Sequence, residues 1–206
     1  MTLGRAAARL RRTARWLCTS ATVRAAAGAA ALLLAAAGGG AAQTPGATPA
    51  TVHLYPGWNN VPYFGEAAEP TVALAAISGR YSKVWHWDAP AQRYAVYDPA
   101  NPAASDLKTL LPGHCYWIVA TVAADFALAP PGAGVVPALT PGWNNLVYTG
   151  IDRPVAEALA SLRGHYGAVY QWDAALQRFR TAPADPTQPA DLARLTPLSC
   201  AWLYFS

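Results

Sequence analysis

Charged residues are scarce in this chain, and acidic residues are missing from its first part. Aspartate, glutamate, lysine and arginine make up 13% of the 206 residues, whereas 53% are hydrophobic. This composition argues against a disordered chain, because there is ample apolar surface to bury. Residues 1–42 contain six arginines and no acid, so the remainder has nine basic against eleven acidic residues. Nucleic-acid binding requires clustered basic residues, so we expect no nucleic-acid partner.

A long, strongly apolar run is also missing. The most apolar segment, residues 25–37, is rich in alanine and shorter than the roughly 20 residues of a membrane span. It follows the arginines and precedes small residues, which is the order of an export signal. We expect residues 1–42 to be a signal peptide cleaved after Ala42; a retained anchor is the weaker alternative. The mature protein would then be secreted or lie in the cell envelope, with no membrane partner.

The strongest positive signal is an internal duplication. Residues 56–121 align with residues 141–206 at a constant offset of 85 without a gap, and 24 of the 66 positions are identical. Two copies of one fold are therefore expected. We predict the following domains: a flexible spacer at residues 43–50, a first repeat domain at 51–129, a linker at 130–136 and a second repeat domain at 137–206.

Comparing the two copies predicts an α+β fold of two tandem similar small domains. Each has mostly antiparallel strands and one short helix, in the order β-α-β-β-turn-β. In the first copy the helix spans residues 70–78, where Leu74 and Ile77 share one face and Gly79 occupies the left-handed position after the helix. Residues 125–128 add a strand that the second copy lacks.

A hairpin follows the predicted helix. Strands at residues 82–87 and 93–97 pair Trp87 with Tyr94 and place Asp88 opposite Arg93, which predicts an exposed cross-strand ion pair. A single helical turn is then expected from Asp106 onward, with this carboxylate capping its free N–H groups. The second copy repeats the pattern.

The repeated residues are interpreted as a structural motif of buried aromatics and turns. They are Gly57, Trp58, Asn59, Trp87, Asp88, Arg93 and Trp117 in the first copy, and Gly142, Trp143, Asn144, Trp172, Asp173, Arg178 and Trp202 in the second. An alternative is a carbohydrate-binding module that uses exposed aromatic rings. In that case Asn60 and Asn145 are tentative ligand contacts, although such residues beside glycine also build turns.

No catalytic or metal-binding motif is recognisable. The four histidines (His53, His86, His114 and His165) do not recur in the other copy, which favours solvated surface residues over metal ligands. The acids shared by both copies are explained by the hairpin and the helical turn. We therefore expect no enzyme, no metal and no cofactor, with an enzyme of unrecognised type as the last alternative.

Two equivalent cysteines, Cys115 and Cys200, leave two interpretations open. Cysteines in an exported chain commonly oxidise, and a disulfide forms if the last strands of the two copies meet. Alternatively, each is a small buried residue in its own copy.

The order of motifs resembles a repeat found in exported proteins of Chloroflexi and other bacteria. The similarity rests on Pro-Gly-Trp-Asn from Pro56, on Trp-Asp followed by Gln-Arg-Tyr, and on residues 107–118, which end in Tyr-Trp-Ile. This chain departs at Asn60 and Asn145, where that repeat has an apolar residue, and at Cys115 and Cys200, where it has glycine. The resemblance implies an extracellular accessory or interaction module, whose partner is an unknown protein or glycan at the cell exterior.

Overall fold

Antiparallel strands dominate the computed structural model of the chain, which describes residues 50–131 and 137–206. The predicted signal peptide, nearly all of the spacer and most of the linker lie outside the described residues. Two four-stranded sheets and two two-stranded sheets are present in the described part, together with short helices. The α+β class with mostly antiparallel strands is thus confirmed.

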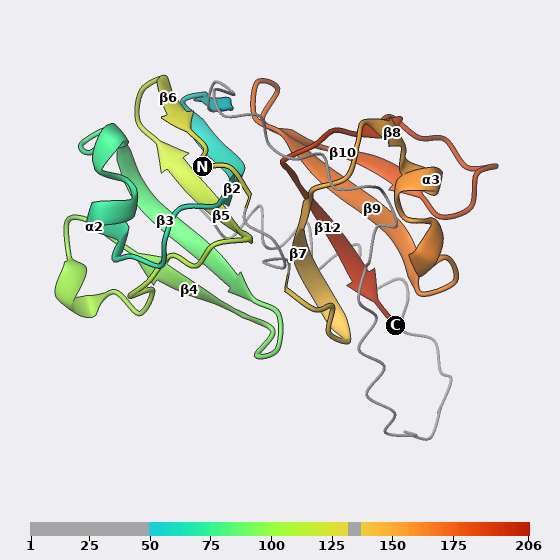
Figure 1. The fold of residues 1–206 in the computed structure, drawn as a ribbon, viewed down its shortest axis with the longest axis horizontal. Coiled ribbons are helices and arrows are strands. Elements are labelled where there is room, and N and C mark those ends of the chain that lie inside the picture. Colours follow the sequence, from blue (N-terminus) through green and yellow to red (C-terminus); the bar gives the residue numbers. More distant parts are fainter. Residues whose placement is uncertain (1–49, 132–136) are drawn as a thin grey trace. The chain divides into compact units, whose positions relative to one another are not determined.

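The first four-stranded sheet has the order β2-β5-β3-β4. Figure 1 shows it in blue-green to yellow, with the helical segment at one face. Its elements are β2 (Gly57–Tyr63), α2 (Pro70–Ala73) with a 3-10 turn (Ala75–Ile77), β3 (Tyr81–Asp88), β4 (Arg93–Tyr97), a second 3-10 turn (Pro102–Ala104) and β5 (His114–Ala120).

The second four-stranded sheet has the order β7-β12-β9-β10, in orange and red in Figure 1. Each of its strands is the 85-residue counterpart of a strand in the first sheet. Its elements are β7 (Gly142–Tyr148), α3 (Val155–Ala158) with a 3-10 turn (Ala160–Leu162), β9 (Tyr166–Asp173), β10 (Arg178–Pro183) and β12 (Ser199–Phe205).

Two short sheets complete the described chain. In the first, β1 (Thr51–Leu54) pairs with β6 (Ala124–Ala127), the extra strand predicted near residues 125–128. In the second, β8 (Arg153–Pro154) pairs with β11 (Arg194–Leu195).

The predicted hairpin is confirmed, and the helix predicted at residues 70–78 is shorter than expected: α2 ends at Ala73 and a 3-10 turn follows it. Leu74 and Ile77 are buried on one face, and Gly79 has a φ of +73°, a value that glycine adopts without strain. The hairpin pairs Trp87 with Tyr94 and Asp88 with Arg93, as the alternation of side chains predicts. The second hairpin has the same register.

Two local predictions are wrong. Asp106 does not begin a helical turn; its carboxylate accepts a hydrogen bond from the Val96 backbone N–H at 2.5 Å, so it covers the free edge of β4. Asp191 does the same for Thr181. The cross-strand Asp88–Arg93 ion pair is also missing, because the Asp88 carboxylate instead accepts from the Ala91 N–H within the hairpin loop.

Each large sheet buries one face in its own hydrophobic core. The first core joins helical residues such as Leu74 to strand residues such as Val84 and Ile118, and the second joins Leu159 to Val169 and Leu203. Because side chains alternate along a strand, the opposite faces of both sheets carry the remaining strand residues, including most tryptophans.

Candidate functional site

The aromatic residues on the second faces of the two sheets contact one another, and we call this region the aromatic interface. The Trp117 ring on β5 lies 5.4 Å from Trp172 on β9, and the Trp202 ring on β12 lies 5.8 Å from Trp87 on β3. Trp202 has only 1% of its surface exposed. The members are Trp58, Trp85, Trp87, Tyr94, Trp117, Trp143, Tyr170, Trp172, Phe179 and Trp202.

A glutamine from each hairpin loop binds the backbone of the opposite sheet. The Gln92 side chain accepts from the Trp143 N–H at 2.8 Å and donates to the Trp143 carbonyl at 2.9 Å. Gln177 makes the same two bonds to Trp58. We call these contacts the glutamine clasps, and they explain why Gln-Arg recurs after Trp-Asp in both copies.

The indole N–H groups of the repeated Trp-Asp motif reinforce the clasps. Trp87 donates to the Trp143 carbonyl at 2.7 Å, and Trp172 donates to the Trp58 carbonyl at 2.7 Å. Each of these hydrogen bonds from the first sheet to the second therefore has a counterpart in the reverse direction, as in a self-complementary two-fold interface.

The repeated glycines are required by the clasps. A Cβ on Gly57 would lie 2.5 Å from the Gln177 side-chain oxygen, and one on Gly142 would lie 2.6 Å from that of Gln92. Both glycines also have φ near +100°, which other residues rarely adopt. The Pro-Gly-Trp-Asn motif of the first copy is thus one side of a contact. The other side is Gln177, which lies 119 residues after Trp58.

A disulfide joins Cys115 of β5 to Cys200 of β12, with their Cα atoms 6.0 Å apart. This confirms the first of the two interpretations of the equivalent cysteines. Phe64 and Val147 surround the bond in a small apolar cluster. The last strands of the two sheets are therefore covalently linked beside the aromatic interface.

The motif asparagines divide into two kinds. Asn59 accepts from the Tyr55 N–H and donates to the Tyr55 carbonyl, both at 2.8 Å, so it builds the turn before β2. Asn144 has the same role toward Thr140. Asn60 and Asn145, the tentative ligand contacts, have their side-chain polar atoms buried without a hydrogen-bond partner among the described residues.

Burial also shapes the chemistry of the tyrosines in the aromatic interface. It raises the pKa of Tyr94 above its ordinary value, and the nearby Trp117 indole acts in the opposite direction with a smaller effect. Burial raises the pKa of Tyr170 as well. These hydroxyls stay protonated at neutral pH and offer no base for catalysis.

One hollow of about 280 Å³ combines aromatic and polar side chains, and we call it the polar hollow. It is lined by Tyr55, Gln171, Trp172, Asp173, Ala174, Ala175 and Arg180. Tyr55 is 39% exposed. Asp173 accepts from the Leu176 N–H and pairs with Arg180, and both contacts hold the pKa of Asp173 below its usual value. The hollow thus combines a fixed carboxylate and a guanidinium with the rings of Tyr55 and Trp172.

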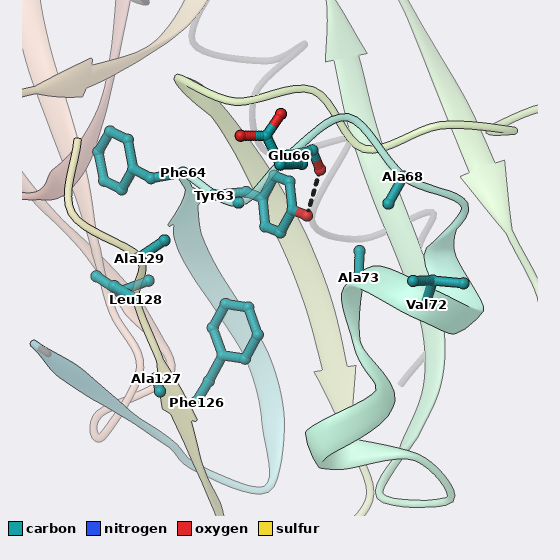
Figure 2. Close-up of a pocket in the computed structure, with 11 residues that line it drawn as sticks. Tyr63, Phe64, Glu66, Ala68, Val72, Ala73, Phe126, Ala127, Leu128 and Ala129 are labelled. Carbon is teal, nitrogen blue, oxygen red and sulfur yellow. Dashed lines mark hydrogen bonds between the residues drawn. The ribbon is translucent and has the colours of Figure 1, made fainter. Parts of the chain in front are cut away.

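A second hollow, of about 260 Å³, is mainly apolar (Figure 2). Phe126 and Leu128 come from the β6 region, and Val72 comes from α2. The Tyr63 hydroxyl donates to the Glu66 backbone carbonyl at 2.7 Å, so its proton is already used within the protein. We call this the apolar groove; Glu66 is the one charged residue among those that line it.

Comparison with models of protein families, with curated proteins and with solved structures finds no match to this chain. None of the helices in residues 50–131 and 137–206 has the length and apolar character needed to span a bilayer.

Two histidines that sequence reasoning treated as separate are brought together. His86 Nε2 lies 3.0 Å from His114 Nδ1, and both side chains are half-buried rather than fully solvated. The two residues are 28 positions apart in the sequence, so no short motif indicates that they form a pair. The pairing of β3 with β5, which places His86 opposite Tyr116 beside His114, was the missing information.

Proposed function

We propose that the mature chain is a noncatalytic extracellular interaction module made of two similar small domains, each a copy of one repeat. One observation carries this proposal: the repeated aromatic and polar residues bind each other across the two sheets. Residues that would otherwise suggest chemistry are thereby used for assembly. The disulfide supports export, because such bonds persist in oxidising compartments.

A carbohydrate ligand is the second candidate, and the polar hollow favours it. Sugars bind where rings stack against aromatic faces while charged and amide groups bind their hydroxyls, and Tyr55, Trp172 and Arg180 offer these groups. The equivalent positions do not repeat this combination, since Thr140 is equivalent to Tyr55 and Ala95 is equivalent to Arg180. A sugar site would then be present once per chain.

A glycan array followed by titration of the bound polysaccharide separates these two functions. Saturable binding that is lost on Tyr55→Thr or Arg180→Ala supports the carbohydrate module. Each substitution introduces the residue found at the equivalent position of the other copy, Thr140 for Tyr55 and Ala95 for Arg180. Tyr204→Ala, which removes another exposed tyrosine, serves as the control and leaves binding unchanged.

The noncatalytic part of the proposal is tested by incubating the exported protein with the same polysaccharides. We expect no release of reducing ends over hours. Release that disappears on Asp173→Asn would contradict the proposal and assign a hydrolase to the polar hollow.

A further inference from the structure

The contact between His86 and His114 has the geometry of two ligands for one ion. His86 lies on β3 and His114 at the start of β5, on the faces opposite Trp85 and Cys115. The facing nitrogens are 3.0 Å apart, and the ring centroids are 5.0 Å apart. Both residues are held on neighbouring strands of one sheet, so the pair is positioned by the backbone.

The separation of the two nitrogens agrees with metal coordination. With Zn–N bonds of about 2.0–2.1 Å, two ligand nitrogens lie about 2.9 Å apart at a right angle and about 3.3 Å apart at a tetrahedral angle. The observed 3.0 Å lies between these values. In this structure the two nitrogens are at hydrogen-bond distance, and an ion bound between them would replace that hydrogen bond.

The surroundings of the pair place one negative charge and one aromatic ring nearby. Asp88 lies two residues after His86 on the same strand, so both side chains are on one face of the sheet, and its carboxylate favours positive charge at His86. The Tyr116 ring, 5.1 Å from His86, covers one side.

We propose that His86 and His114 bind one divalent transition-metal ion, with water in the remaining coordination positions. Imidazole ligands select zinc, nickel and copper over magnesium or calcium. The described residues offer no group of three or more histidine, cysteine, aspartate or glutamate side chains around an ion. The site is therefore an open one with two protein ligands, distinct from the polar hollow and the aromatic interface.

The second copy supplies matched substitutions for a test. Gln171 and Ser199 occupy the positions equivalent to His86 and His114, on strands with the same pairing. His86→Gln and His114→Ser therefore introduce residues that this sheet architecture already accommodates. The second sheet has no such pair of imidazoles, so one ion per chain is expected.

The experiment is calorimetric titration of the untagged, chelator-treated exported protein with Ni²⁺ or Zn²⁺ alone at pH 7. We expect one ion per chain and at least a tenfold loss of affinity in His86→Gln and in His114→Ser. His53→Gln and His165→Gln should keep the affinity of the unaltered protein. Circular dichroism verifies that each variant is folded.

Two results would overturn the proposal. One is the lack of saturable binding by the unaltered protein. The other is binding that persists in both His86→Gln and His114→Ser, which would place the ion elsewhere. The outcome does not depend on the proposed interaction function, because neither variant changes the polar hollow.

Discussion

At the scale of single residues, the glutamine clasps show how a side chain in an exposed loop can serve assembly. Gln92 and Gln177 have φ of 49° and 50°, a left-handed conformation that is uncommon for glutamine. This conformation closes the hairpin loop while the side-chain amide reaches the other sheet. Both glutamines are exposed, so a search for buried residues alone would not have identified them as contacts between the sheets.

Removing the clasps should weaken the contact between the sheets. Gln92→Ala and Gln177→Ala each eliminate two hydrogen bonds to the opposite backbone, and we expect a loss of about 1 kcal/mol in unfolding free energy for each substitution. The two glutamines bind different residues, so the double variant should lose about 2 kcal/mol. Urea denaturation measures these losses.

Gln188→Ala is the control for this series, because Gln188 is an exposed glutamine that bonds only locally to Asp185. Its unfolding free energy should stay within about 0.5 kcal/mol of the unaltered protein. Clasp variants as stable as this control would show that the glutamines do not contribute to assembly.

At the scale of elements, local pattern predicted the hairpins better than the segments that follow them. The register of β3 with β4 follows from side-chain alternation and a four-residue loop, both of which are local properties. The helical turn predicted at Asp106 does not form. An aspartate that can accept from the free N–H groups of a helix can equally accept from a free N–H at the edge of a strand. Which backbone N–H it binds depends on β4 lying nearby.

The burial of His86, on strand β3 beside β5, also predicts that the stability of the protein depends on pH. The folded-state pKa of His86 is about 4, below the ordinary value of 6.5, so the unfolded chain binds more protons between these two values. Stability should therefore be fully present above about pH 6.5 and decline as the pH falls toward 4. The denaturation midpoint in urea, measured with a chelator present, should be lower at pH 5 than at pH 7.

The variant His86→Gln isolates this contribution. It lacks the titrating imidazole, so its midpoint should change less between pH 7 and pH 5 than that of the unaltered protein. Equal changes in both proteins would show that other groups cause the pH dependence.

At the scale of the whole molecule, the disulfide links strands that are 85 residues apart in sequence. A cross-link closing a loop of this length restricts the unfolded chain, and its removal is expected to cost about 4 kcal/mol. The double substitution Cys115→Ala and Cys200→Ala should lower the thermal midpoint accordingly. Calorimetry measures this change.

A reductant provides the matched control. It should lower the midpoint of the unaltered protein toward that of the double variant and leave the variant unchanged. Detection of free thiols from Cys115 and Cys200 under denaturing, non-reducing conditions would contradict the bond.

The internal duplication made part of the aromatic interface predictable from the sequence. The duplication pointed to Gly57, Trp58 and Trp87 as a linked motif, because positions retained in both copies of one chain share a physical role. It did not reveal that each copy completes the other. The polar hollow escaped notice because neither Tyr55 of the first copy nor Arg180 of the second recurs at the equivalent position of the other copy.

Local and repeating features were therefore readable from the residues: strand alternation, the helix ended by Gly79, the hairpin register and the equivalence of Cys115 with Cys200. Contacts between distant segments were decided by tertiary structure, including the disulfide, the glutamine clasps and the meeting of His86 with His114. The reason is physical. Alternation and turn chemistry act over a few neighbouring residues, whereas the proximity of two strands depends on how whole sheets bury their apolar faces.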